Sequence, residues 1–430
     1  MSLSERWSAV LGELRTLGRH RELTAPSGVD FSSNDYLGYG SGRLAQQARD
    51  AGDGTILTLG LWGMGRSERI QEEGGGDSFH LIPRRHPLSS QTASGVRPSR
   101  DGNHPLPDAS GQSGLASRLL RGQHPIWDEV ETALARWHGA EASLMFTSGY
   151  VANEGLLATV IEPHDWVASD QLNHASIIDG LRLSRCERHI YRHCDLNHLE
   201  DGLRAVVQRK PSGRELFIVT ESLFGMEGDV APLEDLVRLA ERYGAHLIVD
   251  EAHATGCFGA TGSGLVDALG LRERVLATVH TGGKALGVAG AYVCGSGQLR
   301  ELLVNRCRHF VFTTALPPIV GGWWLEALAR VSADQSRRSL LHQAASVFRG
   351  ALRERGIPAL GEHYIVPVVL GEDGRTIEAA RRLRAAGWDI RAIRPPTVPE
   401  GAARLRISIH ADHDRDTLQA VAAAVAEALT

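Results

Sequence analysis

The chain has 430 residues, a length that allows two or three domains, and its formal net charge of −5 argues against a nucleic-acid-binding surface, which would be basic. No run reaches the roughly 18 apolar residues of a membrane helix, and the N-terminus lacks a signal-peptide core, so we expect a cytoplasmic protein with no membrane association. Five scattered cysteines without a C-x-x-C pair favour reduced thiols over disulfides or a zinc site.

The N-terminal segment, residues 1–50, predicts a helix followed by a short strand. Apolar residues recur at helical spacing from Leu3 to Leu17. The strand near residue 30 runs into a polar turn that contains Asn34 and Asp35. Side chains of this kind could form no more than an Asx turn.

Residues 51–111 break the pattern. They are rich in Gly, Arg, Ser and Pro, and no amphipathic period lasts. Structureless loops inside compact domains rarely exceed about 15 residues, so we interpret this stretch as an atypical insertion. Its histidines, His80, His86 and His104, are too irregularly spaced to predict a metal site, and we expect none.

Order returns after residue 111, with a helix predicted over residues 125–138. A strand then leads through Ser148 to Gly149 and Tyr150, where another helix begins. The free N–H groups at such a start can bind an anion, although Ser-Gly turns are common. His174 follows the next strand, and it could lie flat on a planar ring or could be a simple turn residue.

Strands then alternate with helices, which predicts a mostly parallel sheet with crossover helices. A strand over residues 216–220 precedes a helix over residues 232–243, which has Pro near its first turn and Gly244 past its end.

Two short apolar runs, residues 247–249 and 275–279, predict buried strands that end in polar groups. The first delivers Asp250 and His253, and the second delivers Thr281 and Lys284. Open α/β sheets place ligand sites at the carboxyl ends of their strands. A lysine that can form a Schiff base, with an aspartate partner for a pyridine nitrogen, is typical of enzymes that use pyridoxal phosphate (PLP). The alternative is that Asp250 caps a helix and Lys284 is a solvated loop residue.

The C-terminal part is expected to be a smaller α/β domain over residues 336–430, after a large domain over residues 112–335. The chain is predicted to be helical from Pro318 to about Gly356. Strands are expected near residues 364–370, 388–393 and 405–409, before a last helix that starts near Asp414.

Five motifs together resemble the α-oxoamine synthases, and they lie along the chain on both sides of the insertion. They are Asn34-Asp35-Tyr36-Leu37-Gly38, Thr147-Ser148-Gly149-Tyr150, Asn173-His174-Ala175-Ser176, Asp250-Glu251-Ala252-His253-Ala254-Thr255-Gly256 and Gly283-Lys284-Ala285-Leu286-Gly287. These PLP enzymes of fold type I join an amino acid to an acyl thioester with loss of carbon dioxide. The resemblance implies an α/β fold with a mostly parallel seven-stranded sheet, flanking helices and a smaller C-terminal α/β domain.

The resemblance also implies roles for individual residues. Lys284 would carry the cofactor, Asp250 would contact its ring nitrogen, His253 its phenolic oxygen, and His174 would stack on the ring, with Lys284, His174 and Asp250 catalytic. Gly149, Tyr150 and Thr281 would hold the phosphate, with Thr313 and Thr314 supplied by the other subunit of a homodimer. Asn34 and Arg406 would bind the substrate carboxylate, Thr397 would line the pocket, and Arg21 would bind substrate, although Arg19 fits nearly as well.

Within the family, residues 394–400 and 404–407 resemble the branch that condenses L-alanine with pimeloyl-CoA or a pimeloyl-carrier protein. Two alternatives stay open: a member that uses glycine or serine, and a catalytically impaired PLP-binding relative. The second is suggested by the insertion and by Gly225, which stands where the family usually has a serine that contacts the cofactor. His280 and Gly282 also depart from the usual loop before Lys284.

Overall fold

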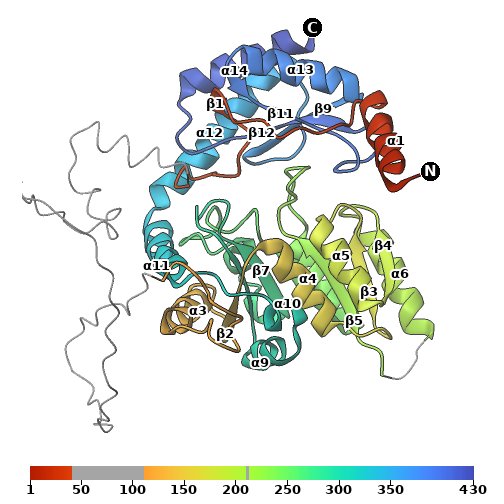
Figure 1. Cartoon of the computed structure of the whole chain (residues 1–430), viewed down its shortest axis with the longest axis vertical. Coiled ribbons are helices and arrows are strands. Elements are labelled where there is room, and N and C mark those ends of the chain that lie inside the picture. The colour runs from red at the N-terminus through yellow and green to blue at the C-terminus, as the bar shows by residue number, and fades with distance from the viewer. Residues whose placement is uncertain (41–110, 210–212) are drawn as a thin grey trace, which may run out of the picture.

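The computed structural model describes residues 1–40, 111–209 and 213–430, which form two stacked α/β units (Figure 1). Apart from Gly111, the predicted insertion over residues 51–111 lies outside the described residues, and so do His80, His86 and His104.

A seven-stranded sheet forms the larger unit, in the order β2-β8-β7-β6-β5-β3-β4. Its strands are β2 (Ala142–Phe146), β3 (Trp166–Asp170), β4 (Glu187–Tyr191), β5 (Leu216–Glu221), β6 (Ala245–Asp250), β7 (Ala277–Thr281) and β8 (Ala291–Gly295). β8 is antiparallel to both of its neighbours, and the other pairings are parallel. The predicted mostly parallel sheet is therefore confirmed.

Helices cover both faces of this sheet. They are α3 (Pro125–Trp137), α4 (Gly149–Val160), α5 (Ala175–Ser184), α6 (Leu196–Arg209), α7 (Leu233–Tyr243), α8 (Leu265–Ala268), α9 (Gly297–Arg306) and α10 (Arg308–Val311), with a 3-10 turn over Arg272–Arg274. The ends of α7 match their signals, because Pro232 is its N-cap and Gly244 closes it with a φ of +64°.

Alternate side chains of each central strand enter two separate cores. In β5, Phe217 and Val219 pack with α4 and α5, whereas Ile218 packs on the opposite face with α6 and α7. Because the strands are buried on both faces, they appear in the sequence as continuous apolar runs that lack alternation.

The smaller unit is a three-stranded antiparallel sheet in the order β11-β12-β9, covered by helices. Its strands are β9 (Ile365–Gly371), β11 (Arg391–Ile393) and β12 (Ala403–Ser408). The accompanying helices are α12 (Gln335–Glu354), α13 (Asp373–Ala385) and α14 (Arg415–Leu429). Helix α11 (Pro318–Ala333) instead packs on α3 of the larger unit (Figure 1), and the predicted domain boundary falls after it, at the start of α12.

The N-terminal segment belongs with this smaller unit. Helix α1 (Leu3–Thr16) leads to β1 (Val29–Asp30), which pairs in parallel with β10 (Trp388–Asp389). The prediction of one strand over residues 388–393 was therefore wrong, because Ile390 separates β10 from β11, which pairs with β12 in another sheet. No described helix is long and apolar enough to cross a membrane.

Candidate active site

Carboxylates end two neighbouring strands of the large sheet. Glu221 is the last residue of β5 and Asp250 the last of β6, and the two are direct register partners. Thr281 ends β7 beside them. Because parallel strands share one carboxyl edge, residues from distant parts of the chain converge there.

Asp250 is 6% exposed, and each of its carboxylate oxygens has a partner. Oδ1 accepts a hydrogen bond from the backbone N–H of Ala252 at 2.8 Å. Oδ2 accepts one from Nδ2 of Asn153, on α4, at 2.7 Å. The alternative that Asp250 caps a helix is wrong, since the residues after it form turns.

Lys284 is partly buried, and its Nζ lies 2.8 Å from Nε2 of His253. Burial lowers the pKa of this amine to about 8, while the nearby charges of Asp250 and Glu221 act in the opposite direction. A neutral amine, which is the nucleophilic form, is therefore accessible near physiological pH.

Hydrogen bonds beyond His253 fix where its proton lies. The Tyr36 hydroxyl donates to Oδ1 of Asn34 at 2.9 Å, so it accepts from Nδ1 of His253 at 2.7 Å. Nε2 of His253 is then the acceptor that faces Lys284. Burial, together with the charges of Lys284 and Arg406, holds the pKa of His253 well below its usual range, so this ring is neutral.

Arg406 closes the other end of this chain of contacts. Its Nη2 donates to Oδ1 of Asn34 at 2.9 Å and to the Tyr36 hydroxyl at 3.2 Å. Its Nε donates to the backbone oxygen of Gly225 at 2.6 Å. Arg406 comes from the small sheet, Asn34 from the N-terminal segment and Gly225 from the loop after β5, so three distant segments meet here.

His174, the N-cap of α5, is the neutral tautomer with its proton on Nε2. Its Nδ1 accepts from the backbone N–H of Ser176 at 3.2 Å and faces that residue's hydroxyl at 2.7 Å. The hydroxyl in turn accepts from Nδ2 of Asn153 at 3.0 Å, so it donates to His174. Burial lowers the pKa of His174, and its Nε2–H remains as a donor.

The N-terminus of α4 has free N–H groups that could bind an anion. Its first N–H groups, those of Gly149 and Tyr150, have no acceptor within the helix. A Cβ added at Gly149 would lie 3.5 Å from Cβ of Thr281, so the end of β7 adjoins this helix start. The Thr281 hydroxyl is directed at the backbone oxygen of Gly290 at 3.4 Å, a long contact that a better acceptor could replace.

The two candidate arginines near the N-terminus differ in their partners. Arg19 is held by Asp373 at 2.8 Å and by Glu400 at 2.5 Å. Arg21 donates from Nη2 to the hydroxyl of Thr397 at 3.1 Å. Arg21 is therefore free of ion pairs among the described residues, and it adjoins a second predicted pocket residue, which favours it over Arg19.

The described contacts of Thr313 and Thr314 are with residues outside this cluster. Thr314 forms an isolated bridge with Ser117, and both threonines line a small cavity beside Arg118. Within the described part of one chain, neither is hydrogen-bonded to Lys284 or Asp250.

Three polar residues of the cluster had no predicted role: Tyr36, Asn153 and Glu221. Glu221 accepts from the backbone N–H of His174 at 2.7 Å, and burial raises the pKa of its carboxyl well above the usual range. The signal that singled out Asp250, a carboxylate at the end of a buried strand, applies equally to Glu221. Tyr36 and Asn153 gave no such signal, because each acts through a neighbour that is distant in sequence.

Comparisons with known proteins agree with this geometry. The aminotransferase class I and II family model matches residues 100–425. An 8-amino-7-oxononanoate synthase of Chlorobaculum parvum is 48% identical over 71% of this chain and 78% of its own. One from Anaeromyxobacter dehalogenans is 47% identical over 73% of this chain and 78% of its own. A high-resolution structure of SPT with PLP has a TM-score of 0.70, is 30% identical, and covers 74% of this chain and 80% of its own.

Proposed function

The chain belongs to the aminotransferase class I and II family, and within it to the PLP-dependent 8-amino-7-oxononanoate synthases, and from this premise we propose its reaction and the roles of its residues. The reaction is the decarboxylative condensation of L-alanine with pimeloyl-CoA, or with a pimeloyl-carrier protein, to give 8-amino-7-oxononanoate for biotin synthesis. The fold is the fold type I arrangement of PLP enzymes.

The side chains at the carboxyl edge of the sheet fit PLP. The amine of Lys284 is available to bind an aldehyde, and Asp250 supplies a buried carboxylate for a ring nitrogen. The start of α4, with Thr281, supplies N–H and hydroxyl donors for a phosphate. When bound, PLP supplies an aldehyde that condenses with amines and a protonated ring that takes up electrons.

When its amine is free, Lys284 would remove the Cα proton of alanine. Its lowered pKa, about 8, leaves a substantial neutral fraction for that task. Nε2 of His253 accepts a hydrogen bond at 2.8 Å, so it orients the amine in the resting enzyme. Asp250, held by Asn153 and Ala252, would keep the ring nitrogen protonated.

Substrate would be positioned by Arg406 and His174. Arg406, supported by Asn34, offers a guanidinium for the alanine carboxylate. His174 carries its proton on Nε2, which is the form that can donate to the thioester oxygen as negative charge develops there. Thr397, with Arg21, would line the pocket for the acyl chain.

One observation carries this proposal. Lys284, whose pKa is lowered, lies against a neutral His253, and both are at the carboxyl edge of the sheet, where Asp250 ends β6. The test is turnover of L-alanine with pimeloyl-CoA, followed by thiol release, across a panel that includes glycine, serine and shorter and longer acyl thioesters. Preferred turnover of alanine with the pimeloyl thioester supports the proposal. Preference for glycine or serine would assign another α-oxoamine synthase, and PLP binding without turnover would assign the impaired relative.

We also propose that the protein is a cytoplasmic homodimer whose sites are shared. The described contacts of Thr313 and Thr314 in their own chain are with residues outside the Lys284 cluster, which supports a role in the partner's phosphate site. Mixing inactive Lys284→Ala chains with inactive Thr313→Ala chains in equal amounts should restore about a quarter of full activity averaged over all dimers, if subunits exchange at random. Half of the dimers would then be mixed, and each mixed dimer would have one intact site. No recovery, in mixtures that form mixed dimers, would reject the shared site.

A further inference from the structure

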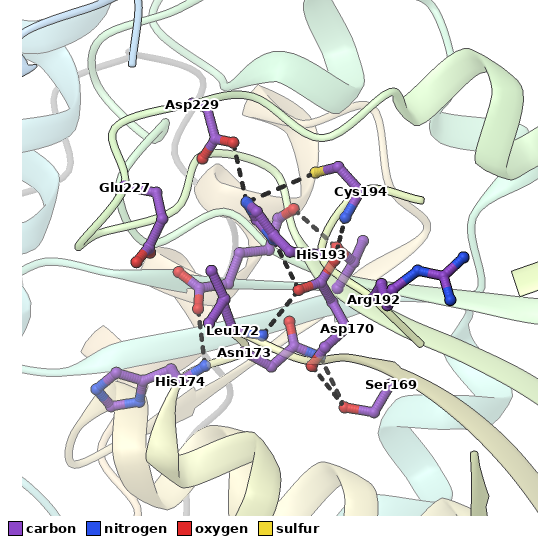
Figure 2. Close-up of polar contacts among 12 residues, drawn as sticks. Ser169, Asp170, Leu172, Asn173, His174, Arg192, His193, Cys194, Glu227 and Asp229 are labelled. Carbon is purple, nitrogen blue, oxygen red and sulfur yellow. Dashed lines mark hydrogen bonds and ion pairs between the residues drawn. The ribbon is translucent and has the colours of Figure 1, made fainter. Parts of the chain in front are cut away.

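His193, in the loop between β4 and α6, lies between two carboxylates (Figure 2). Its Nδ1 is 2.8 Å from Oδ1 of Asp170, and its Nε2 is 2.9 Å from Oδ2 of Asp229. Each ring nitrogen thus faces an acceptor-only group, and both contacts are hydrogen bonds only when both nitrogens carry protons.

Asp170 connects this histidine to the turn that carries His174. It is the last residue of β3, and its side chain is 1% exposed. Oδ1 also accepts from the backbone N–H of Leu172 at 2.8 Å, and Oδ2 accepts from that of Cys194 at 2.9 Å. The carboxylate therefore sets the course of the turn two residues before His174.

Asp229 connects the same histidine to the loop after β5. In that loop, the backbone oxygen of Gly225 accepts from Arg406, and Glu227 is ion-paired with Arg404 at 2.9 Å. The Asp170-His193-Asp229 clamp therefore joins the turn that presents His174 to the loop that anchors Arg406.

We infer that His193 is a positioning residue, which as an imidazolium holds His174 and Arg406 at a fixed separation across the active site. This inference rests on the proposed function, because it is the condensation that needs both groups in register. His193 touches neither reacting group directly, and it acts through the two backbone segments that it ties together.

The charges around His193 favour the imidazolium. Burial lowers the pKa of the ring, but the hydrogen bonds that the ring donates to Asp170 and Asp229 outweigh burial and raise that pKa to about 12. Among the described residues, two other ionisable groups face the ring. Cys194 has its Sγ 3.9 Å from Nε2, and Glu227 is ion-paired with Arg404. A neutral His193 would leave Asp170 and Asp229 as two negative charges facing one ring.

The same side chains could also face a metal ion, since ligand atoms of Asp170, His193 and Cys194 lie within 4.8 Å of one another. A metal at Nε2 would need that nitrogen to be unprotonated, which separates the two interpretations by experiment. The contacts at 2.8 and 2.9 Å favour protons on both nitrogens.

The first experiment needs no turnover, and it uses a variant only to assign a signal. Nitrogen-15 NMR of the histidine rings in the full chain should show one ring with both nitrogens protonated throughout pH 6 to 9, and His193→Gln assigns the signal. A His193 ring that titrates near its ordinary value of about 6.5 would overturn the inference. So would loss of the Nε2 proton on addition of one equivalent of Zn²⁺ at pH 8.

The second experiment compares His193→Gln with His246→Gln. His246 is the second residue of β6, at the end opposite Asp250, and it also pairs with a carboxylate, Glu215 at 3.1 Å. The control therefore makes the same chemical change far from the site. For His193→Gln we expect PLP affinity within about twofold of wild type, weaker alanine affinity because Arg406 shifts, and kcat about 10²-fold lower, as for a catalytic group displaced by about 1 Å. Equal kcat in the two variants would overturn the inference.

Asp229→Asn gives a milder test in case His193→Gln fails to fold. It keeps the Asp170 contact and removes one negative charge, so we expect smaller losses of kcat and of alanine affinity than in His193→Gln. Unchanged kcat would count against the clamp. If the wild-type chain turned over no substrate, the proposed reaction would fall, while the NMR measurement would still decide whether His193 is an imidazolium.

Discussion

Nε2 of His253 lies 2.8 Å from the amine of Lys284, and a Cβ built on Gly225 would meet that same nitrogen at 2.4 Å. The ring of His253 therefore occupies space that any side chain at position 225 would need. This contact gives the departure from the family's usual serine a physical meaning, because glycine is what allows the histidine to approach the lysine.

Gly225→Ala should destabilise the protein by about 1–3 kcal/mol, as expected for an overpacked buried site. The clash is with His253, so the loss should shrink when His253→Ala is added. A double-mutant cycle measured by urea unfolding of the cofactor-free protein tests this coupling. Additive losses would mean that the two positions are independent.

Lys284→Ala should abolish the PLP-dependent visible absorbance band and all turnover. The sequence offers an unusually clean control, since its only lysines are Lys210 and Lys284. Borohydride reduction of the loaded protein followed by peptide mass spectrometry should place the cofactor on Lys284, and Lys210→Ala should behave as wild type. Label on Lys210 would reject the assignment.

The rate at which PLP binds covalently to the cofactor-free protein should rise with pH and level off above about 8. The reason is that burial lowers the pKa of Lys284 to about 8, and only the neutral amine attacks an aldehyde. Stopped-flow absorbance across pH 6 to 10 measures this profile. A rate that still climbs steeply at pH 10 would show an ordinary, solvated lysine.

Stability should fall steeply in mild acid because two buried histidines are neutral in the fold. Burial lowers the pKa of His138 to about 3 and holds that of His280 well below its usual range. The unfolded chain binds protons near pH 6.5 and the native chain does not, so each ring costs about 1.4 kcal/mol for every pH unit below 6.5.

The corresponding measurement is unfolding free energy against pH between 7 and 4. His138→Gln should lower stability at pH 7 by removing the contact with Tyr292, which is 2.7 Å long, but should also flatten the slope by one proton. His164→Gln, at an exposed position, should leave the slope unchanged. An unchanged slope in His138→Gln would mean that another group takes up the proton.

Buried strands and their polar ends were predictable from the sequence, since apolar runs that stop at Asp250 or Thr281 can be recognised without a fold. Strand β8 gave no separate signal, because its antiparallel direction depends on its neighbours β2 and β7. The break between β10 and β11 was also hidden, since β10 pairs with a two-residue strand more than 350 positions earlier.

Within the site, residues that stand in recognisable motifs were predictable, and the residues that orient them were not. Asn153 is hydrogen-bonded to Asp250, which lies 97 positions later in the chain. His193 connects two segments through its ion pairs with Asp170 and Asp229. Such partners depend on contacts between distant segments, for which local periodicity and propensity carry no information.

Nη2 of Arg406 donates hydrogen bonds to both Asn34 and Tyr36. The hydroxyl of Tyr36 in turn determines the tautomer of His253. An incoming carboxylate that captures this nitrogen must loosen at least one of those bonds. Binding of an anion to Arg406 would therefore alter the hydrogen bonding of the Lys284 amine, through Tyr36 and His253. In the resting protein, these hydrogen bonds couple the two subsites, so that filling the carboxylate subsite changes the hydrogen bonding of the nucleophilic amine.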